Sequence, residues 1–182
     1  QLITTASADV PLKGLIFLIR AYADLLKEFP DLELLVIGRL REGPTDQELK
    51  KEGIKEKVKF ISDLTGRQIA ELYAESTIAV SPSVYEGFGF PAGEAMSCGI
   101  PLISTNGGSL PEVVGDAAIV VPHSNPKALK DAIKLLLKSP EKRLDLGNRG
   151  RKRVLEKFTW KRAARELVEV YREAIENANN RS

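Results

Sequence analysis

Short apolar runs alternate with amphipathic segments along most of the chain. Six runs rich in β-branched and other apolar residues predict strands, and several are apolar almost throughout, as is typical of strands covered on both faces. The predicted strands are Leu2–Ala6, Leu32–Ile37, Val58–Ile61, Ile78–Val80, Leu102–Ser104 and Ala118–Val121.

The segments between these runs have helical periodicity. Apolar residues from Leu15 to Phe29 recur every three or four positions and form one stripe, and Pro30 ends that helix. Capping-box spacing and prolines that follow a capping residue mark further helix starts. The capping boxes are Thr45/Glu48, Thr65/Gln68 and Ser109/Glu112, and the proline starts are Asn125-Pro126 and Ser139-Pro140. Three helices are predicted after the last strand, at Pro126–Lys138, Glu141–Lys157 and Thr159–Asn177.

Strands and helices that alternate in this way predict an α/β fold, a Rossmann-like three-layer α/β/α structure with a six-stranded parallel sheet and additional C-terminal helices. The expected strand order is 3-2-1-4-5-6, in which ligands bind where strands 1 and 4 diverge. The loop Ser7–Gly14 and the loop Ser81–Gly93 should therefore line one crevice.

Composition narrows the class of protein. The chain has 182 residues, 43% hydrophobic and 29% charged, with a net charge of +2. This balance gives no general reason to expect binding to nucleic acid or to a membrane, and no apolar run reaches the roughly 18 residues of a membrane span. The single cysteine fits a reducing compartment. We expect a cytoplasmic protein, with a peripheral place at the inner membrane surface left open, and a chain cut from a longer one because it starts without methionine.

The candidate chemistry lies between Ser81 and Gly99. Gly87, Gly89 and Gly93 relax backbone sterics where a loop enters a helix near Pro91, and glycine lets a ligand approach the backbone closely. The N-terminus of such a helix offers free N–H groups and the positive end of its dipole. This arrangement predicts a phosphate site.

Two carboxylates flank the glycines. We place Glu94 in the first helical turn, where it can accept two hydrogen bonds from a cis-diol such as a ribose. Glu86 precedes the glycines and should lie nearer a sugar beyond the phosphates. Singly, Glu94 also fits a role at the helix N-terminus and Glu86 a solvated loop carboxylate. The spacing and the glycines together favour the binding role.

The segment Glu86-Gly-Phe-Gly-Phe-Pro-Ala-Gly-Glu94 resembles the E-x7-E motif of glycosyltransferase family 4, also called group 1. Three further blocks resemble this family in the same order along the chain. They are Glu71–Thr77, Ala95–Glu112, and Gly150–Val154 with Phe158–Trp160. The resemblance covers roughly Pro11 to Tyr171.

The resemblance implies the C-terminal, donor-binding domain of a GT-B enzyme, with a UDP-, GDP- or ADP-linked sugar as donor substrate and no other cofactor. It implies that Glu94 holds the ribose hydroxyls, that Glu86 faces the donor sugar and that Lys13 pairs with the diphosphate. Glu86 and Lys13 are the expected catalytic residues. The expected donor-binding residues are Lys13, Arg39, Asp63, Gly87, Phe88, Gly89, Phe90, Pro91 and Glu94.

One departure concerns the phosphate site. The family usually carries a Gly-Arg pair shortly before the lysine, and Ser7-Ala8 stands in that place. Arg39 is a candidate replacement, although it also fits a surface arginine. Asp63 follows the third strand and is expected to border a nucleobase pocket.

Other chemistry-bearing residues fit simpler roles. We expect His123 in a loop, Cys98 as a small buried thiol and Trp160 as a packing anchor. The basic cluster Arg149–Arg153 fits a solvated helix face better than a nucleic acid site. No grouping of histidines and carboxylates has metal-ligand spacing, so we expect no metal.

The expected reaction is retaining transfer of a hexose-type sugar to an unknown acceptor. Residues 1–158 would form the nucleotide-sugar-binding domain, and residues 159–182 a helix that reaches back to an N-terminal acceptor-binding domain. This chain alone should then be inactive. Two alternatives remain open: a GT-B nucleotide-sugar epimerase, and a non-catalytic nucleotide-binding or receiver-like domain, for which Asp9 gives faint support.

Overall fold

Six parallel strands form one sheet in the computed structural model, which describes residues 1–6 and 10–179. The order is β3-β2-β1-β4-β5-β6, so the predicted topology is confirmed. The strands are β1 (Leu2–Thr5), β2 (Leu34–Ile37), β3 (Val58–Ile61), β4 (Ile78–Ser81), β5 (Leu102–Thr105) and β6 (Ile119–Val121).

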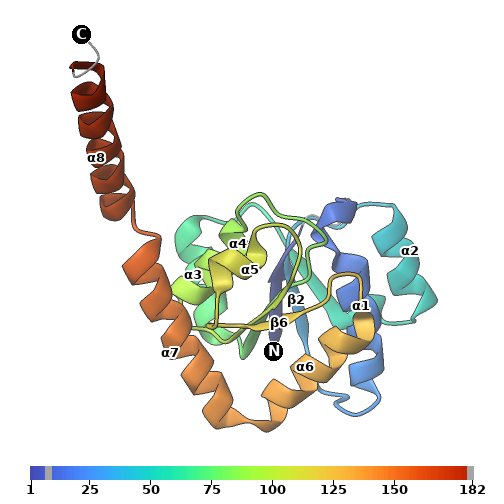
Figure 1. Cartoon of the computed structure of the whole chain (residues 1–182). Helices are drawn as coiled ribbons and strands as arrows, with labels where there is room; N and C mark the ends of the chain where they lie inside the picture. The colour runs from blue at the N-terminus through green and yellow to red at the C-terminus, as the bar shows by residue number, and fades with distance from the viewer. Residues whose placement is uncertain (7–9, 180–182) are drawn as a thin grey trace.

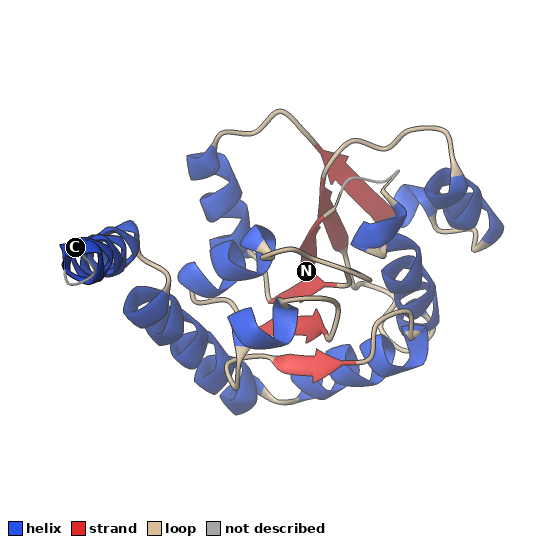
Figure 2. Cartoon of the chain, turned by 45° about the horizontal axis from the view of Figure 1, so that its top comes forward, coloured by secondary structure: helices blue, strands red, loops and turns tan. Residues whose placement is uncertain are grey.

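Helices cover both faces of this sheet (Figure 2). Their bounds are η1 (Pro11–Lys13), α1 (Leu15–Leu26), α2 (Pro44–Lys51), η2 (Lys55–Lys57), α3 (Gly66–Glu75), α4 (Phe90–Ser97), α5 (Leu110–Val114), α6 (Pro126–Lys138), α7 (Pro140–Lys157) and α8 (Trp160–Asn179). Successive strand residues point to opposite faces. Leu2 therefore packs in the core under α1 and α6, and Ile3 in the core under α3, α4 and α5.

Helix ends agree with the sequence where the capping residue meets no other partner. The Thr65/Gln68 capping box and the Asn125 cap are present. The other two capping boxes were wrong. Helix α2 already starts at Pro44, so Thr45 lies inside it, and the Ser109 hydroxyl donates to a distant carbonyl described below.

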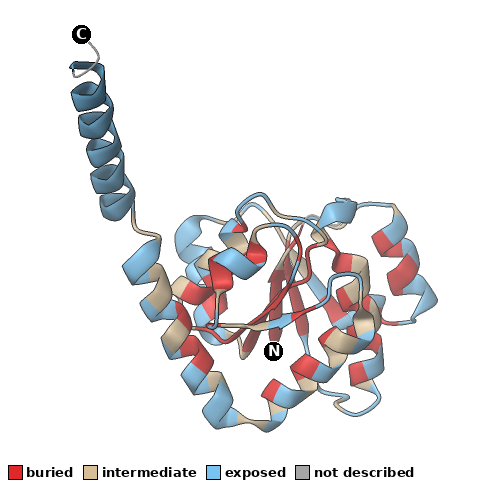
Figure 3. Ribbon diagram, in the orientation of Figure 1, coloured by how far each residue is buried: buried red, intermediate tan, exposed pale blue. Residues whose placement is uncertain are grey.

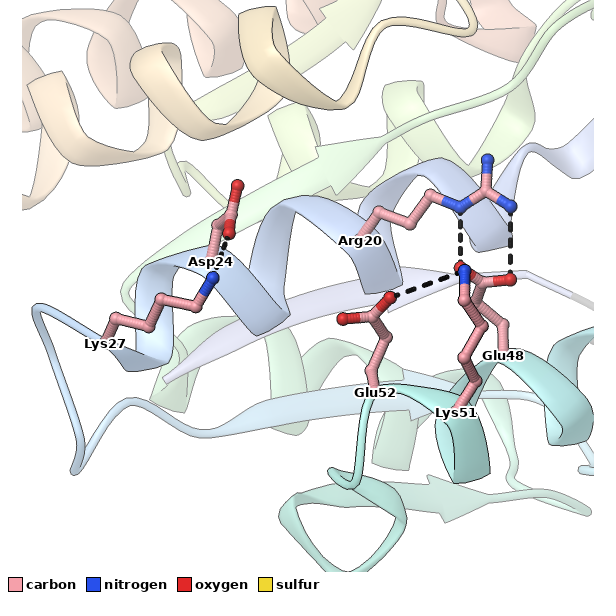
Figure 4. Close-up of polar contacts among 6 residues, drawn as sticks. All are labelled: Arg20, Asp24, Lys27, Glu48, Lys51 and Glu52. Carbon is pink, nitrogen blue, oxygen red and sulfur yellow. Dashed lines mark hydrogen bonds and ion pairs between the residues drawn. The ribbon is translucent and has the colours of Figure 1, made fainter.

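A charged cluster joins α2 to α1 (Figure 4). The Arg20 guanidinium donates to both carboxylate oxygens of Glu48, at 2.7 and 3.1 Å, and Lys51 lies 3.4 Å from the same carboxylate. The Glu48 side chain is only 8% exposed. The hydrogen bond from Arg20 outweighs burial and lowers the pKa of Glu48 below its ordinary value. This cluster ties the segment after β2 to the sheet domain.

Helix α7 packs closely against the C-terminal end of α4. A Cβ at Gly147 would overlap the carbonyl of Gly99, so only glycine permits the approach. Arg151 donates to the Ser97 carbonyl at 2.6 Å, and Arg153 donates to carbonyls at the end of α5. Two arginines of the basic cluster Arg149–Arg153 therefore bind carbonyl groups at the ends of α4 and α5. The prediction of a solvated helix face did not include these contacts.

Helix α8 projects away from the sheet domain and buries none of its residues (Figures 1 and 3). Its exposed large apolar side chains are Trp160, Leu167, Val168, Val170, Tyr171 and Ile175. The expectation that Trp160 anchors packing was wrong within this chain, because its side chain is 87% exposed. Within residues 1–6 and 10–179, no helix combines the length and apolar character that crossing a membrane requires.

Candidate functional site

The loops that follow β1 and β4 lie side by side at the carboxyl edge of the sheet. The backbone N–H groups of Val84 and Tyr85 donate to the Leu12 carbonyl at 2.8 and 3.4 Å. Gly14 has a φ of 64°, and a side chain there would overlap the carbonyl of Pro82. The expected juxtaposition is confirmed for residues 10–14, while Ser7, Ala8 and Asp9 lie outside the described residues.

Lys13 and Glu86 meet across this junction. The Lys13 ammonium donates to Oε1 of Glu86 at 2.7 Å, and the Ser83 hydroxyl donates to the same oxygen at 2.8 Å. The Lys13 side chain is 28% exposed and that of Glu86 11%. Two residues to which the sequence assigned separate roles therefore form one ion pair at the switch between β1 and β4.

The loop after β5 holds the backbone of the Glu86 segment. Ser109 donates to the Glu86 carbonyl through its N–H at 3.0 Å and its hydroxyl at 3.1 Å, and the Thr105 hydroxyl donates to the Ser83 carbonyl. A Cβ at Gly107 would lie 2.6 Å from that Ser83 carbonyl. Sequence reasoning missed these contacts, although the glycine pair Gly107-Gly108, one residue beyond the end of β5, was a visible signal.

The N-terminus of α4 follows Glu86 and is capped by glycine. Gly89 has a φ of 91°, and its carbonyl accepts from the Ala92 N–H at 3.0 Å. Pro91 has no N–H. In the described part of the chain, the N–H groups of Gly89 and Phe90 have no acceptor; Gly89 is buried, whereas Phe90 is exposed at the positive end of the helix dipole, where anions are favoured.

Glu94 lies deeper in α4 than expected. The helix begins at Phe90, so Glu94 is its fifth residue and the first-turn placement was wrong. Its carboxylate is exposed and lines a groove of about 450 Å³ between α4 and the α7–α8 junction. No described residue forms a hydrogen bond or ion pair with that carboxylate, which leaves it available to a diol.

Aromatic rings form the wall of the same groove. The Phe88 ring lies 4.9 Å from that of Phe90 and 5.6 Å from that of Phe158. Arg153 lies over the Phe158 ring at 5.9 Å, a cation–π contact. Phe88 and Phe90 thus face α8, while Glu86 faces Lys13.

Arg39 and Asp63 pair with each other beyond β2 and β3. Their side chains are 2.6 Å apart and exposed. Hydrogen bonds from Ser62 and Arg39 lower the pKa of Asp63. This exposed ion pair does not test the donor-binding roles expected of Arg39 and Asp63, which stay predictions.

The remaining candidates have structural contacts. The His123 backbone N–H donates to Asn106 Oδ1 at 2.9 Å, in the loop after β6. Cys98 is half-buried at the end of α4. Over residues 1–6 and 10–179, no group of three or more His, Cys, Asp or Glu side chains is placed to hold a metal ion.

Comparison with known proteins decides the family. Residues 1–153 match the family described as glycosyl transferases group 1. The chain belongs to this family. It is 40% identical over 179 residues to the MMP alpha-(1->4)-mannosyltransferase of Mycolicibacterium hassiacum, covering 96% of this chain and 43% of that protein. It is 29% identical over 177 residues to the D-inositol 3-phosphate glycosyltransferase of Saccharomonospora viridis, covering 91% and 41%.

Solved structures agree with the fold of this group 1 domain. The C-terminal domain of a group 1 family protein, LpcC from Francisella tularensis, superposes with a TM-score of 0.76 at 26% identity, over 87% of this chain and 86% of that chain. Anabaena HepE, solved with UDP-glucose, superposes with a TM-score of 0.82 at 21% identity, over 94% and 48%, which shows the fold alone. The chain spans about two fifths of the curated relatives named above and corresponds to the C-terminal half of a GT-B glycosyltransferase.

Proposed function

We propose that this chain binds a nucleotide-diphosphate sugar and is the donor half of a retaining glycosyltransferase that transfers a hexose-type sugar. The observation that carries the proposal is the contact of Lys13 with Glu86 beside the open N-terminus of α4, at the point where β1 and β4 diverge. Ligands of doubly wound sheets bind at that point. The mannosyltransferase relative makes mannose a natural first sugar to test.

Each of four groups has a role in this proposal: Lys13, Glu86 and the N-terminus of α4 at the crevice, and Glu94 in the groove between α4 and the α7–α8 junction. The N–H groups of Gly89 and Phe90, together with Lys13, bind the diphosphate and stabilise the charge that develops on it as the sugar leaves. Glu94 accepts hydrogen bonds from the ribose hydroxyls. Glu86 faces the donor sugar and steadies positive charge near its anomeric carbon.

The long C-terminal helix supports an interdomain role. We propose that residues 1–158 form the nucleotide-sugar-binding domain and that α8, within residues 159–182, packs against an N-terminal acceptor-binding domain. Its apolar residues lie on one side of a helix that contacts no core of its own. The acceptor would bind in that other domain, so this chain alone should bind donor weakly and turn nothing over.

Calorimetric titration of the chain with UDP, GDP and ADP, and with their glucose and mannose conjugates, tests the proposal. We expect saturable binding to one nucleotide series, weakened about 10- to 100-fold in Glu94→Ala because a carboxylate–diol contact is lost. Glu75→Ala removes an exposed carboxylate from α3 and is the matched control. A folded chain that binds none of these ligands would contradict the proposal.

A further inference from the structure

The two oxygens of the Glu86 carboxylate are not equivalent. Lys13 Nζ and Ser83 Oγ both donate to Oε1, at 2.7 and 2.8 Å. Among residues 1–6 and 10–179, no group donates to Oε2. A carboxylate can accept about four hydrogen bonds, and a side chain only 11% exposed has few waters to supply the rest. Oε2 is therefore the oxygen left for a ligand.

We propose that Ser83 is a positioning residue that fixes the Glu86 carboxylate so that Oε2 accepts a hydrogen bond from a hydroxyl of the donor sugar. This inference rests on the proposed function, and it assigns to Ser83 a role that the family motif does not contain. Ser83 acts through Glu86 and does not itself touch the sugar.

Lys13 alone does not fix the orientation of this carboxylate. A lysine ammonium is a point charge on a flexible stem with three rotatable donors, so it can follow the carboxylate through several rotamers. The Ser83 hydroxyl comes from a buried residue, 3% exposed, on the same loop. Two donors of different origin on one oxygen restrict rotation of the group and preorganise Oε2.

The backbone of Ser83 is held independently of its hydroxyl. Its carbonyl accepts a hydrogen bond from the Thr105 hydroxyl, and Gly107 packs against the same carbonyl. The neighbouring Val84 is tied to Leu12 by its own N–H. Removing the hydroxyl should therefore leave the loop in place and release only the carboxylate.

The test compares the affinity of the chain for a nucleotide diphosphate with its affinity for the corresponding sugar conjugate, using the pair that binds tightest among UDP, GDP, ADP and their glucose and mannose forms. The dissociation constant of the diphosphate, divided by that of its sugar conjugate, isolates the contribution of the sugar to binding. In Ser83→Ala we expect the ratio to fall about fivefold, the range of one hydrogen bond to a charged group, with the nucleotide affinity nearly unchanged.

Two controls separate positioning from a structural effect. Ser104→Ala also removes a buried hydroxyl, one that donates to the Thr105 carbonyl at 3.2 Å, and it should leave the ratio unchanged. In a Glu86→Ala background, Ser83→Ala should have no further effect on the ratio, because coupled residues are not additive. Ser83→Cys keeps the size but donates weakly, so it gives an intermediate ratio and replaces Ser83→Ala if that variant does not fold.

Three results overturn the inference. A Ser83→Ala chain that loses thermal stability but keeps the wild-type ratio would make Ser83 structural only. An unchanged effect of Ser83→Ala in the Glu86→Ala background would remove the link to Glu86. A wild-type chain that binds the nucleotide and its sugar conjugate equally would leave Glu86 without a sugar to hold. Failure to bind any nucleotide would instead sink the proposed function itself.

Discussion

Neutralising Glu86 should tighten the binding of a nucleotide diphosphate. In the free chain the Lys13 ammonium is already paired with the Glu86 carboxylate 2.7 Å away, and the Glu86 side chain is only 11% exposed. A bound diphosphate must share this cation with Glu86. Glu86→Gln keeps the shape of the side chain and removes the competing charge.

The magnitude follows from the geometry. A phosphate oxygen bonded to Lys13 at about 2.8 Å lies roughly 5 Å from Glu86 Oε1. Two unit negative charges at that separation repel by about 3 kcal/mol at an effective dielectric constant of 20. Because the ammonium lies between them and Lys13 is 28% exposed, we take about half of this value. The expected gain is about 1.5 kcal/mol, or about tenfold in affinity.

Titration calorimetry with the nucleotide diphosphate, without sugar, measures this effect at low and physiological salt. Lys13→Met is the contrasting variant, and we expect it to weaken binding about 10- to 100-fold because the charge-assisted contact is lost. The free energy of unfolding of Glu86→Gln should be lower than that of the wild type by no more than about 1 kcal/mol, the range of a partly exposed ion pair. Equal or weaker nucleotide binding by Glu86→Gln would refute the reasoning.

Three further predictions concern stability. Glu48→Gln should lower the free energy of unfolding by about 2 kcal/mol at pH 7. Arg20 lowers the pKa of Glu48 in the folded chain, so this stabilisation is present above the pKa of Glu48 in the unfolded chain and is lost as pH falls through its pKa in the folded chain. Urea melts at pH 7 and pH 3 should show that the stability advantage of the wild type over Glu48→Gln shrinks at the lower pH. Gly107→Ala places a Cβ 2.6 Å from the Ser83 carbonyl and should destabilise by about 1–3 kcal/mol in the same melts, whereas a neutral result would mean that the loop shifts freely. Leu167→Glu should change stability by less than about 0.5 kcal/mol, and a larger loss would show that α8 packs on the sheet domain.

The strands and their order were predictable because each strand carries its own signal. A buried parallel strand is apolar on both sides, so runs such as those at β2 and β4 stand out without any knowledge of their neighbours. Alternation with helices then restricts the topology. The topology also predicted that the loops after β1 and β4 lie side by side, and the structure confirms that placement for the described residues.

The capping errors show where local spacing stops being informative. Thr65 and Gln68 cap α3 because both are exposed and nothing else competes for them. Ser109 has the same spacing to Glu112, yet its hydroxyl donates to the Glu86 carbonyl on another loop. A serine hydroxyl takes the acceptor that the fold supplies, which the local sequence does not encode.

Pattern and spacing alone determined the α/β class, the sheet order and the edge of the sheet where the loops after β1 and β4 meet. Tertiary structure decided which groups meet: Lys13 with Glu86, Ser83 with the same carboxylate oxygen, Ser109 with the Glu86 carbonyl, and Arg39 with Asp63. Periodicity reports the burial of each residue along one chain, whereas a hydrogen bond depends on the positions of two residues that packing brings together.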